Sequence, residues 1–186
     1  MHSPWFTVEL TEEVAPWAFC KGLPYKAISA LELLGTVMAV MILGDFPEEF
    51  GGVHGAVRIR GFTDSQVSSQ VVTRGMTTSF PLCCVTMDLA AKLEEAGARL
   101  DLEWVPRTAN VEADALSNFD TSGFDLGLRR EVQWDSPKWA RLRRLFEEGA
   151  DFFLARQASR KQCGEPPTQP PKKRARDGGL RVREPW

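Results

Sequence analysis

The sequence has few of the residues that build zinc-binding or disulfide-linked scaffolds. Its 186 residues include four cysteines and two histidines, and no two cysteines stand in a C-x-x-C arrangement. A structural zinc site needs four such ligands, usually in closely spaced pairs, so the composition argues against one. We therefore expect reduced, buried thiols, which are the usual state of cysteine in a cytosolic or nuclear protein.

A long uncharged apolar run is also lacking. The most apolar stretch, residues 28–43, contains Glu32 and is shorter than the roughly 20 apolar residues that a membrane-spanning helix needs. The hydrophobic content of 43% and the mean hydropathy of -0.24 instead indicate a soluble globular protein with no membrane partner. The length leaves room for one domain of about 120 residues and an appendage.

The near-neutral net charge of -2 hides an uneven distribution along the chain. Residues 1–120 contain 8 Lys and Arg against 16 Asp and Glu, whereas residues 121–186 contain 15 against 9. An acidic body with a basic tail suits a carboxylate metal site joined to a contact with nucleic acid or an import receptor. An ordinary solvated surface with a disordered tail is the alternative.

Hydrophobic periodicity predicts strands alternating with helices, which is typical of an α/β fold. Strands are expected at residues 5–10, 17–20, 57–64 and 99–104. Helices are expected at residues 26–43, 81–95 and 136–158, with shorter ones between Asp64 and Gly75 and after Asn110. Gly75 is placed to end its helix and Asn110 to cap the next.

Three acidic residues stand out against this pattern. Glu32 interrupts a helix that is apolar nearly all round, where a buried carboxylate costs several kcal/mol unless it is paired or binds a metal. Asp64 ends a predicted strand, and Asp114 falls in the first turn of the helix that follows the strand at residues 99–104. Each has a plainer alternative: Glu32 can reach solvent at the helix edge, and Asp64 can be a helix N-cap.

The motifs around these residues resemble those of a known family. Residues 104–106 read W-V-P and residues 110–117 read N-x-x-A-D-A-L-S, which resembles the last catalytic segment of the ribonuclease H domain of retrotransposon reverse transcriptases, in elements of the LTR or tyrosine-recombinase type. The I-x-x-L-E-L-L motif at Glu32 and the T-D-S motif at Asp64 are similar to the family's two preceding acidic motifs. The resemblance covers roughly residues 5–120.

The resemblance implies a ribonuclease H-like mixed sheet with flanking helices. It implies that Glu32, Asp64 and Asp114 are catalytic residues and ligands of Mg²⁺ or Mn²⁺. Two-metal catalysis of this kind hydrolyses the RNA strand of an RNA–DNA hybrid, with one ion activating water and the other stabilising the leaving oxygen. The implied partners are nucleic acid and the rest of a reverse transcriptase polyprotein.

The sequence departs from the family pattern at two positions. No Asp precedes Asp45, so the family's first-strand Asp has no counterpart, and the His-bearing loop before the last helix is replaced by Arg107, Thr108 and Ala109. We therefore expect a domain truncated at its first strand, with weak or no activity. A non-catalytic nucleic-acid-binding remnant of the same fold and an unrelated α/β interaction protein are the alternatives.

The predicted organisation is a partial ribonuclease H-like domain (1–120), a linker (121–135), a helical extension (136–160) and a disordered basic tail (161–186). Residues 170–176, P-P-K-K-R-A-R, resemble a monopartite nuclear localisation signal. Its cations are Lys172, Lys173, Arg174 and Arg176. They predict a nuclear import receptor as a partner and a nuclear (or else cytoplasmic) location. Nonspecific contact with phosphates is the rival interpretation of this tail.

Overall fold

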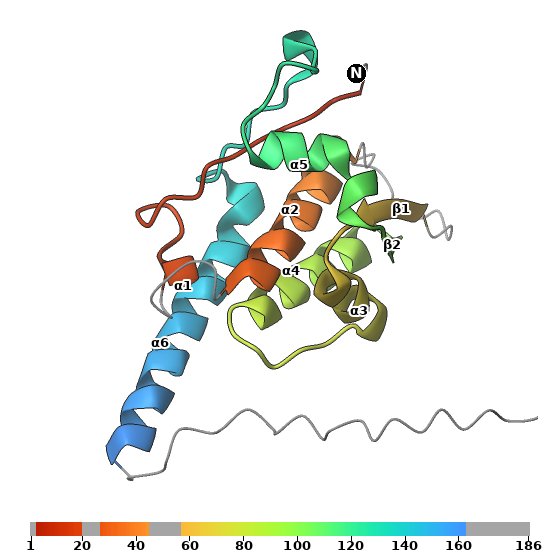
Figure 1. Ribbon diagram of the computed structural model, residues 1–186. Helices are drawn as coiled ribbons and strands as arrows, with labels where there is room; N and C mark the ends of the chain where they lie inside the picture. Colours follow the sequence, from red (N-terminus) through yellow and green to blue (C-terminus); the bar gives the residue numbers. More distant parts are fainter. Residues whose placement is uncertain (1–2, 20–26, 45–56, 163–186) are drawn as a thin grey trace, which may run out of the picture.

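Helices pack against one face of a small parallel sheet in the computed structural model, which describes residues 3–19, 27–44 and 57–162 (Figure 1). The strands are β1 (Val57–Thr63) and β2 (Ala98–Trp104). The helices are α1 (Pro16–Phe19), α2 (Ile28–Leu43), α3 (Gln66–Arg74), α4 (Leu82–Glu95), α5 (Val111–Ser117) and α6 (Ala140–Gln162), with 3₁₀ turns η2 (Arg107–Ala109), η3 (Leu126–Leu128) and η4 (Pro137–Trp139). The predicted α/β class and the long helix near the C-terminus are confirmed.

The two strands run parallel, in register from Val57 opposite Ala98 to Thr63 opposite Trp104. Helices α3 and α4 form the crossover between them, as a parallel pair requires. The inner face is closely packed at Gly61, where a Cβ atom would lie 3.2 Å from Cδ1 of Leu102. Within the described ranges the sheet has these two strands, so the larger mixed sheet stays a prediction.

Two different surfaces result from the alternation of side chains along the strands. Leu100 and Leu102 point inward and are buried in the core, whereas Arg58 and Arg60 point to the opposite, solvated face. On that face, Arg58 pairs with Asp101 and Arg60 pairs with Glu103. The helices that share the core with the sheet therefore cover its inner face.

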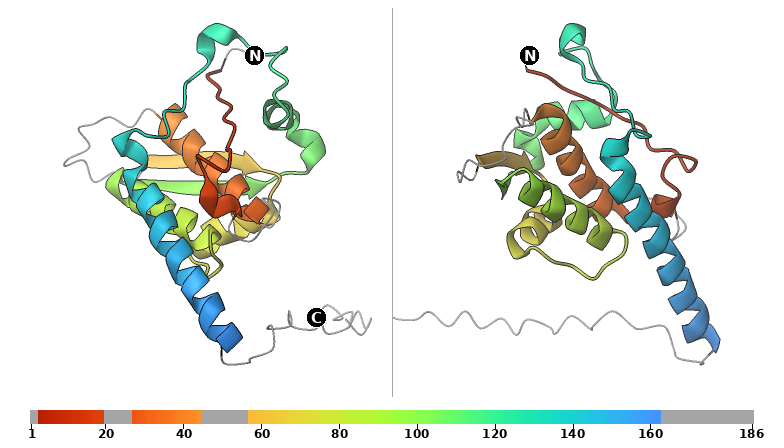
Figure 2. Two further views of the ribbon diagram at one scale, coloured as in Figure 1. Left: turned by 90° about the vertical axis from the view of Figure 1, so that its left-hand side faces the viewer. Right: turned by 180° about the vertical axis from the view of Figure 1, so that it is seen from behind.

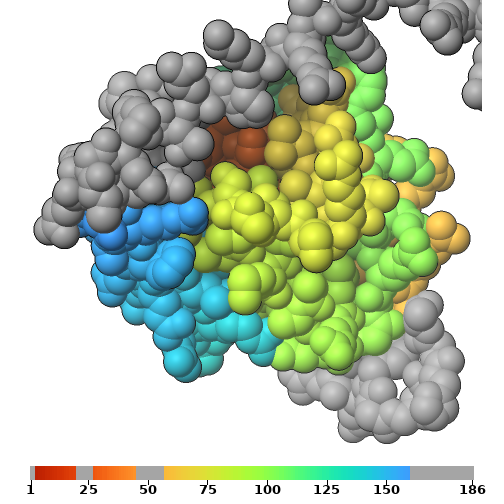
Figure 3. Space-filling model, turned by 90° about the horizontal axis from the view of Figure 1, so that it is seen from below, coloured from red at the N-terminus to blue at the C-terminus, as the bar shows by residue number. Residues whose placement is uncertain are grey.

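The core is built mainly from α2, α4 and the first half of α6. Their buried side chains include Leu33, Val37, Val85, Leu142 and Phe146. Figure 3 shows α3, α4 and α6 side by side on one surface of the molecule. Figure 2 shows the C-terminal half of α6 extending away from the rest, which agrees with the exposure of Phe152 and Leu154.

Both strands predicted near the N-terminus are wrong. Residues 16–19 form α1, because Pro16 suits the first position of a helix and Trp17 finds its apolar partner in α6. The rings of Trp17 and Phe146 stack with centroids 3.9 Å apart. Residues 5–10 make one isolated bridge, between Trp5 and Arg129, instead of a ladder.

The N-terminal segment is held by the stretch predicted as a linker. Trp5 donates from Nε1 to the carbonyl oxygen of Asp125 at 2.8 Å, and Thr7 donates from Oγ1 to the carbonyl oxygen of Leu116 at 3.0 Å. Leu116 belongs to α5, and Phe6, Val8 and Leu10 are half-buried against the hydrophobic core, so this segment is held without a strand partner. Tertiary partners of this kind leave no signal in a local pattern.

None of the helices in the described part of the chain is long and apolar enough to cross a bilayer. The predicted nuclear localisation signal, with Lys172, Lys173, Arg174 and Arg176, lies outside the described residues. It remains a prediction from the sequence.

Candidate strand-end carboxylate site

Asp64 occupies the turn between β1 and α3. The backbone N–H of Ser65 donates to Oγ1 of Thr63 at 3.1 Å, and Oγ of Ser65 accepts from the N–H of Ser68 at 3.2 Å. Ser65 is thus the N-cap of α3, and the carboxylate of half-buried Asp64 is not used as the cap. Capping of α3 therefore does not explain why an acid stands at position 64.

The end of β2 is tied directly to this turn. Trp104 donates from Nε1 to the carbonyl oxygen of Asp64 at 3.0 Å, and the N–H of Val105 donates to the carbonyl oxygen of Thr63 at 2.8 Å. Pro106 then ends the strand pairing, because it has no N–H to donate. The chain turns through η2 into α5, which carries Asp114 in its first turn.

Asn110 is the N-cap residue of α5, which confirms its predicted position, although the cap is not made by its side chain. Its carbonyl oxygen instead accepts from the N–H of Asp114 at 3.0 Å, which starts the helix through the backbone. The preceding 3₁₀ turn sets the direction in which Asn110 enters the helix.

Arg107 pairs with Asp114 at this end of the sheet. Its Nε donates to Oδ1 of Asp114 at 2.8 Å, and a terminal nitrogen contacts the same oxygen. The pKa of Arg107 is raised, first by the hydrogen bond that it donates to Asp114 and by the charge of that carboxylate, and to a smaller extent by the charge of Asp64. The structure therefore brings two of the three predicted site residues to one place, with a cation beside them.

Glu32 does not complete this group. It lies on an exposed part of α2, so the cost of burying its carboxylate does not arise, and the alternative of a side chain that reaches solvent agrees with the structure. Across residues 3–19, 27–44 and 57–162, no three Asp, Glu, His or Cys side chains gather closely enough to hold a metal ion. The metal-ligand roles of Glu32, Asp64 and Asp114 remain predictions.

A two-metal centre requires several carboxylates that converge on ions roughly 4 Å apart. The arrangement described here offers Asp64 and Asp114, and Arg107 competes with any cation for Asp114. These residues do not fit such a centre as they stand. An arginine with two carboxylates at an open strand end is better suited to contact a phosphate than to activate water.

A buried ion pair within α4, beside the η4 turn, was not predicted from the sequence. Asp88 is 0% exposed, and Nζ of Lys92 lies 3.7 Å from its Oδ2. Lys92 also donates from Nζ to the carbonyl oxygen of Lys138 at 2.8 Å and lies over the ring of Trp139. Asp88 and Lys92 stand four residues apart on a predicted helix, and this spacing is typical of an ion pair. The spacing does not reveal that the pair is buried.

Comparison with known proteins adds no relative to this picture. The chain matches no family model, no curated protein and no solved structure.

Proposed function

We propose that this chain is a ribonuclease H-like domain of retroelement reverse transcriptase origin that binds RNA–DNA hybrids and hydrolyses their RNA strand weakly or not at all. The observation that carries the proposal is the parallel pairing of β1 with β2, which brings Asp64 and Asp114 to the same end of the sheet. Open α/β sheets bind their ligands at this carboxyl end of the strands.

The order of the elements supports the same proposal. An acid follows β1, a helical crossover leads to β2, and a second acid begins the next helix, in the order that the sequence motifs imply. Trp104, at the end of β2, is 46% exposed beside these residues. An exposed ring next to an arginine is a common platform for nucleic-acid bases and phosphates.

Binding without efficient hydrolysis follows from the charges at the site. Arg107 compensates Asp114, and in the described ranges no third acid joins them. When a hybrid approaches, a phosphate can replace the carboxylate of Asp114 as the partner of the guanidinium. Arginine can bind either oxyanion through two N–H donors. This exchange needs no bound metal ion.

The proposal is tested with the chain purified free of host ribonucleases. Binding and cleavage of a labelled hybrid are measured in Mg²⁺ and in Mn²⁺, for the parent chain and for Asp64→Asn and Arg107→Gln. We expect salt-dependent binding that Arg107→Gln weakens, with little or no cleavage. Asp135→Asn, at an exposed residue before α6, is the control and should bind as the parent does.

The other outcomes discriminate the alternatives. Cleavage at a rate comparable with an intact ribonuclease H, lost in Asp64→Asn, would show an active nuclease and reject the impaired form. Neither binding nor cleavage would favour the α/β interaction protein, in which these acids are surface residues.

A further inference from the structure

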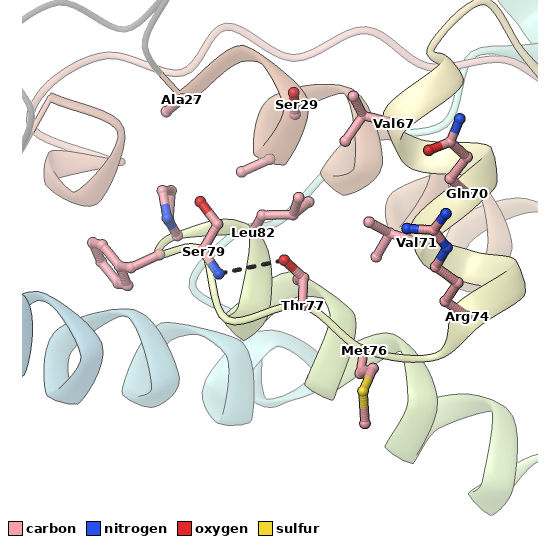
Figure 4. A pocket seen from close by; sticks show the side chains of 13 residues that line it. Ala27, Ser29, Val67, Gln70, Val71, Arg74, Met76, Thr77, Ser79 and Leu82 are labelled. Carbon is pink, nitrogen blue, oxygen red and sulfur yellow. Dashed lines mark hydrogen bonds between the residues drawn. The ribbon is translucent and has the colours of Figure 1, made fainter. Parts of the chain in front are cut away.

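A cavity of about 370 Å³ lies between the first turn of α2, one side of α3 and the loop from α3 to α4 (Figure 4). This is within the size range of sites that hold small molecules. None of the predicted site residues Glu32, Asp64 and Asp114 lines it. The cavity is therefore a separate feature from the strand-end site.

The polar wall of the cavity carries a single charge. Among the described residues that line it, Arg74 is the one charged residue and none is an acid. Figure 4 shows Gln70 and Arg74 along α3, with Ser29 of α2 across the cavity and Thr77 on the loop below. Amide and hydroxyl groups can donate hydrogen bonds, so these four side chains together favour an oxyanion.

Arg74 has no protein partner in the part of the chain that the structure describes. No hydrogen bond or ion pair involves its guanidinium there, whereas Arg58, Arg60 and Arg107 are paired with acids. The exposed Arg130 and Arg156 also have no acidic partner in the described residues, but neither of them lines this cavity. Its place in the last turn of α3 is itself favourable, because a cation offsets the negative end of the helix dipole. That explains the charge but not the polar side chains of Ser29, Gln70 and Thr77 that line the same cavity.

The rest of the lining is largely apolar and includes residues of α3 that are neighbours of Gln70 and Arg74. Val67, Val71 and Leu82 contribute side chains to it, and Val71 and Leu82 are buried. A site with one cation, several neutral donors and an aliphatic wall is complementary to a molecule with an anionic end and an apolar body. A bare inorganic ion would leave the apolar wall uncovered.

We propose that this cavity binds a small organic anion, with a carboxylate or phosphate group held by Arg74 and an apolar group packed on Val71 and Leu82. The proposal goes beyond the proposed function, since it concerns a small molecule and a different part of the fold. A neighbouring hollow shares Arg74 but is also lined by Glu94 and Asp101, so its charges are of both signs and do not select an anion.

Amide chemical shifts of the ¹⁵N-labelled chain test the proposal, with benzoate and phenyl phosphate as anionic probes and benzamide as the neutral match. We expect the anions to shift the amides of Ser29, Val71 and Thr77 and to saturate at millimolar concentration. Arg74→Gln should weaken benzoate about tenfold and leave benzamide unchanged, because only the charge-assisted contact is lost. Arg74→Lys should retain part of the preference.

Arg60→Gln is the matched control, because Arg60 is already paired with Glu103 and lies on the outer face of β1. It should leave the binding of all three probes unchanged. Equal binding of benzoate and benzamide overturns the proposal, as do shifts confined to residues outside the cavity or no saturable shift up to about 10 mM. The dispersion of the same spectra shows that each variant is folded.

Discussion

The Nε atom of Arg107 donates a hydrogen bond of 2.8 Å to Oδ1 of Asp114, and the charge of Asp64 acts on the same guanidinium. Asp114, one of the acids that the sequence motifs single out, is therefore paired with an arginine that the family resemblance did not assign. The pair lies at the surface, so solvent screens it. The pair matters because Arg107 competes with metal cations for the carboxylate of Asp114.

Arg107→Gln should strengthen the binding of Mn²⁺ to this end of the sheet. Removal of the guanidinium leaves the carboxylate of Asp114 without its paired cation, so a divalent ion meets less competition there. We expect a gain of about two- to fivefold in affinity, the size that a solvent-screened pair allows. Paramagnetic broadening of the amides near Asp64 and Asp114 measures it.

Two further variants define the Mn²⁺ experiment. Arg58→Gln removes an arginine that is paired with Asp101 on the outer face of the sheet, and it should leave the broadening unchanged. In the double variant Arg107→Gln with Asp114→Asn the gain should disappear. Equal or weaker Mn²⁺ binding by Arg107→Gln would contradict the view that Arg107 occupies the carboxylate.

Nuclear import is predicted to depend on the basic tail. Replacement of Lys172, Lys173 and Arg174 by Ala should move a fluorescent fusion, large enough to need active transport, from the nucleus to the cytoplasm. The clustered cations are what an acidic receptor groove recognises. Unchanged nuclear accumulation would reject the signal, and loss of hybrid binding without relocation would favour contact with phosphates.

The sequence predicted those elements whose burial follows a local period. Leu100 and Leu102 alternate with solvated residues and are the buried positions of β2, and α2 and α4 begin and end within two residues of their predicted limits. Gly75 ends α3 with a φ of +71°, a conformation that glycine adopts without strain. These signals depend on neighbours in the chain and not on the rest of the fold.

The parts that were not predictable depend on contacts between distant segments. Trp17 belongs to a helix because its ring stacks on Phe146, and Glu32 is exposed because no described element covers its side of α2. The strand-end positions of Asp64 and Asp114 could be read from the pattern. The contact with Arg107 could not, because it depends on how η2 and α5 turn after Pro106.

The buried carboxylate of Asp88 should make stability depend on pH. Burial raises the pKa of Asp88, and the charges of Lys92 and Arg141 oppose that rise while Glu95 adds to it. A pKa that is higher in the folded state gives a stabilising contribution that is complete below the unfolded pKa, about 3.9, and is lost as pH rises through the folded pKa. Acidification from neutral pH should therefore favour the folded chain at this site.

Asp88→Asn should remove that contribution. The free energy of unfolding of the variant and of the parent is measured in urea between about pH 4 and 7. The difference between the two should change with pH, by at most about 1.4 kcal/mol per pH unit, because one proton is involved. The parent should lose stability relative to the variant as pH rises. Asp135→Asn, at an exposed position, is the control, and identical pH slopes for Asp88→Asn and the parent would refute the prediction.

Two helical glycines should respond to alanine in opposite directions. Gly35 in α2 has open space where a Cβ would lie, so Gly35→Ala should stabilise the chain by up to about 1 kcal/mol through helix propensity. At Gly149 in α6 the added Cβ would lie 2.6 Å from Cε2 of Phe80 and 3.0 Å from Sγ of Cys84. Because Phe80 is buried and its ring stacks on Phe153, it has little room to move.

Gly149→Ala should therefore destabilise the chain by about 1 to 3 kcal/mol, since the cost of overpacking exceeds the gain in propensity. Urea unfolding of both variants measures the difference, and an unchanged m-value would show that the denatured states are comparable. Phe80→Leu in the Gly149→Ala background should recover part of the loss by removing the atoms in contact. A Gly149→Ala chain as stable as Gly35→Ala would mean that α6 does not approach Phe80 this closely in solution.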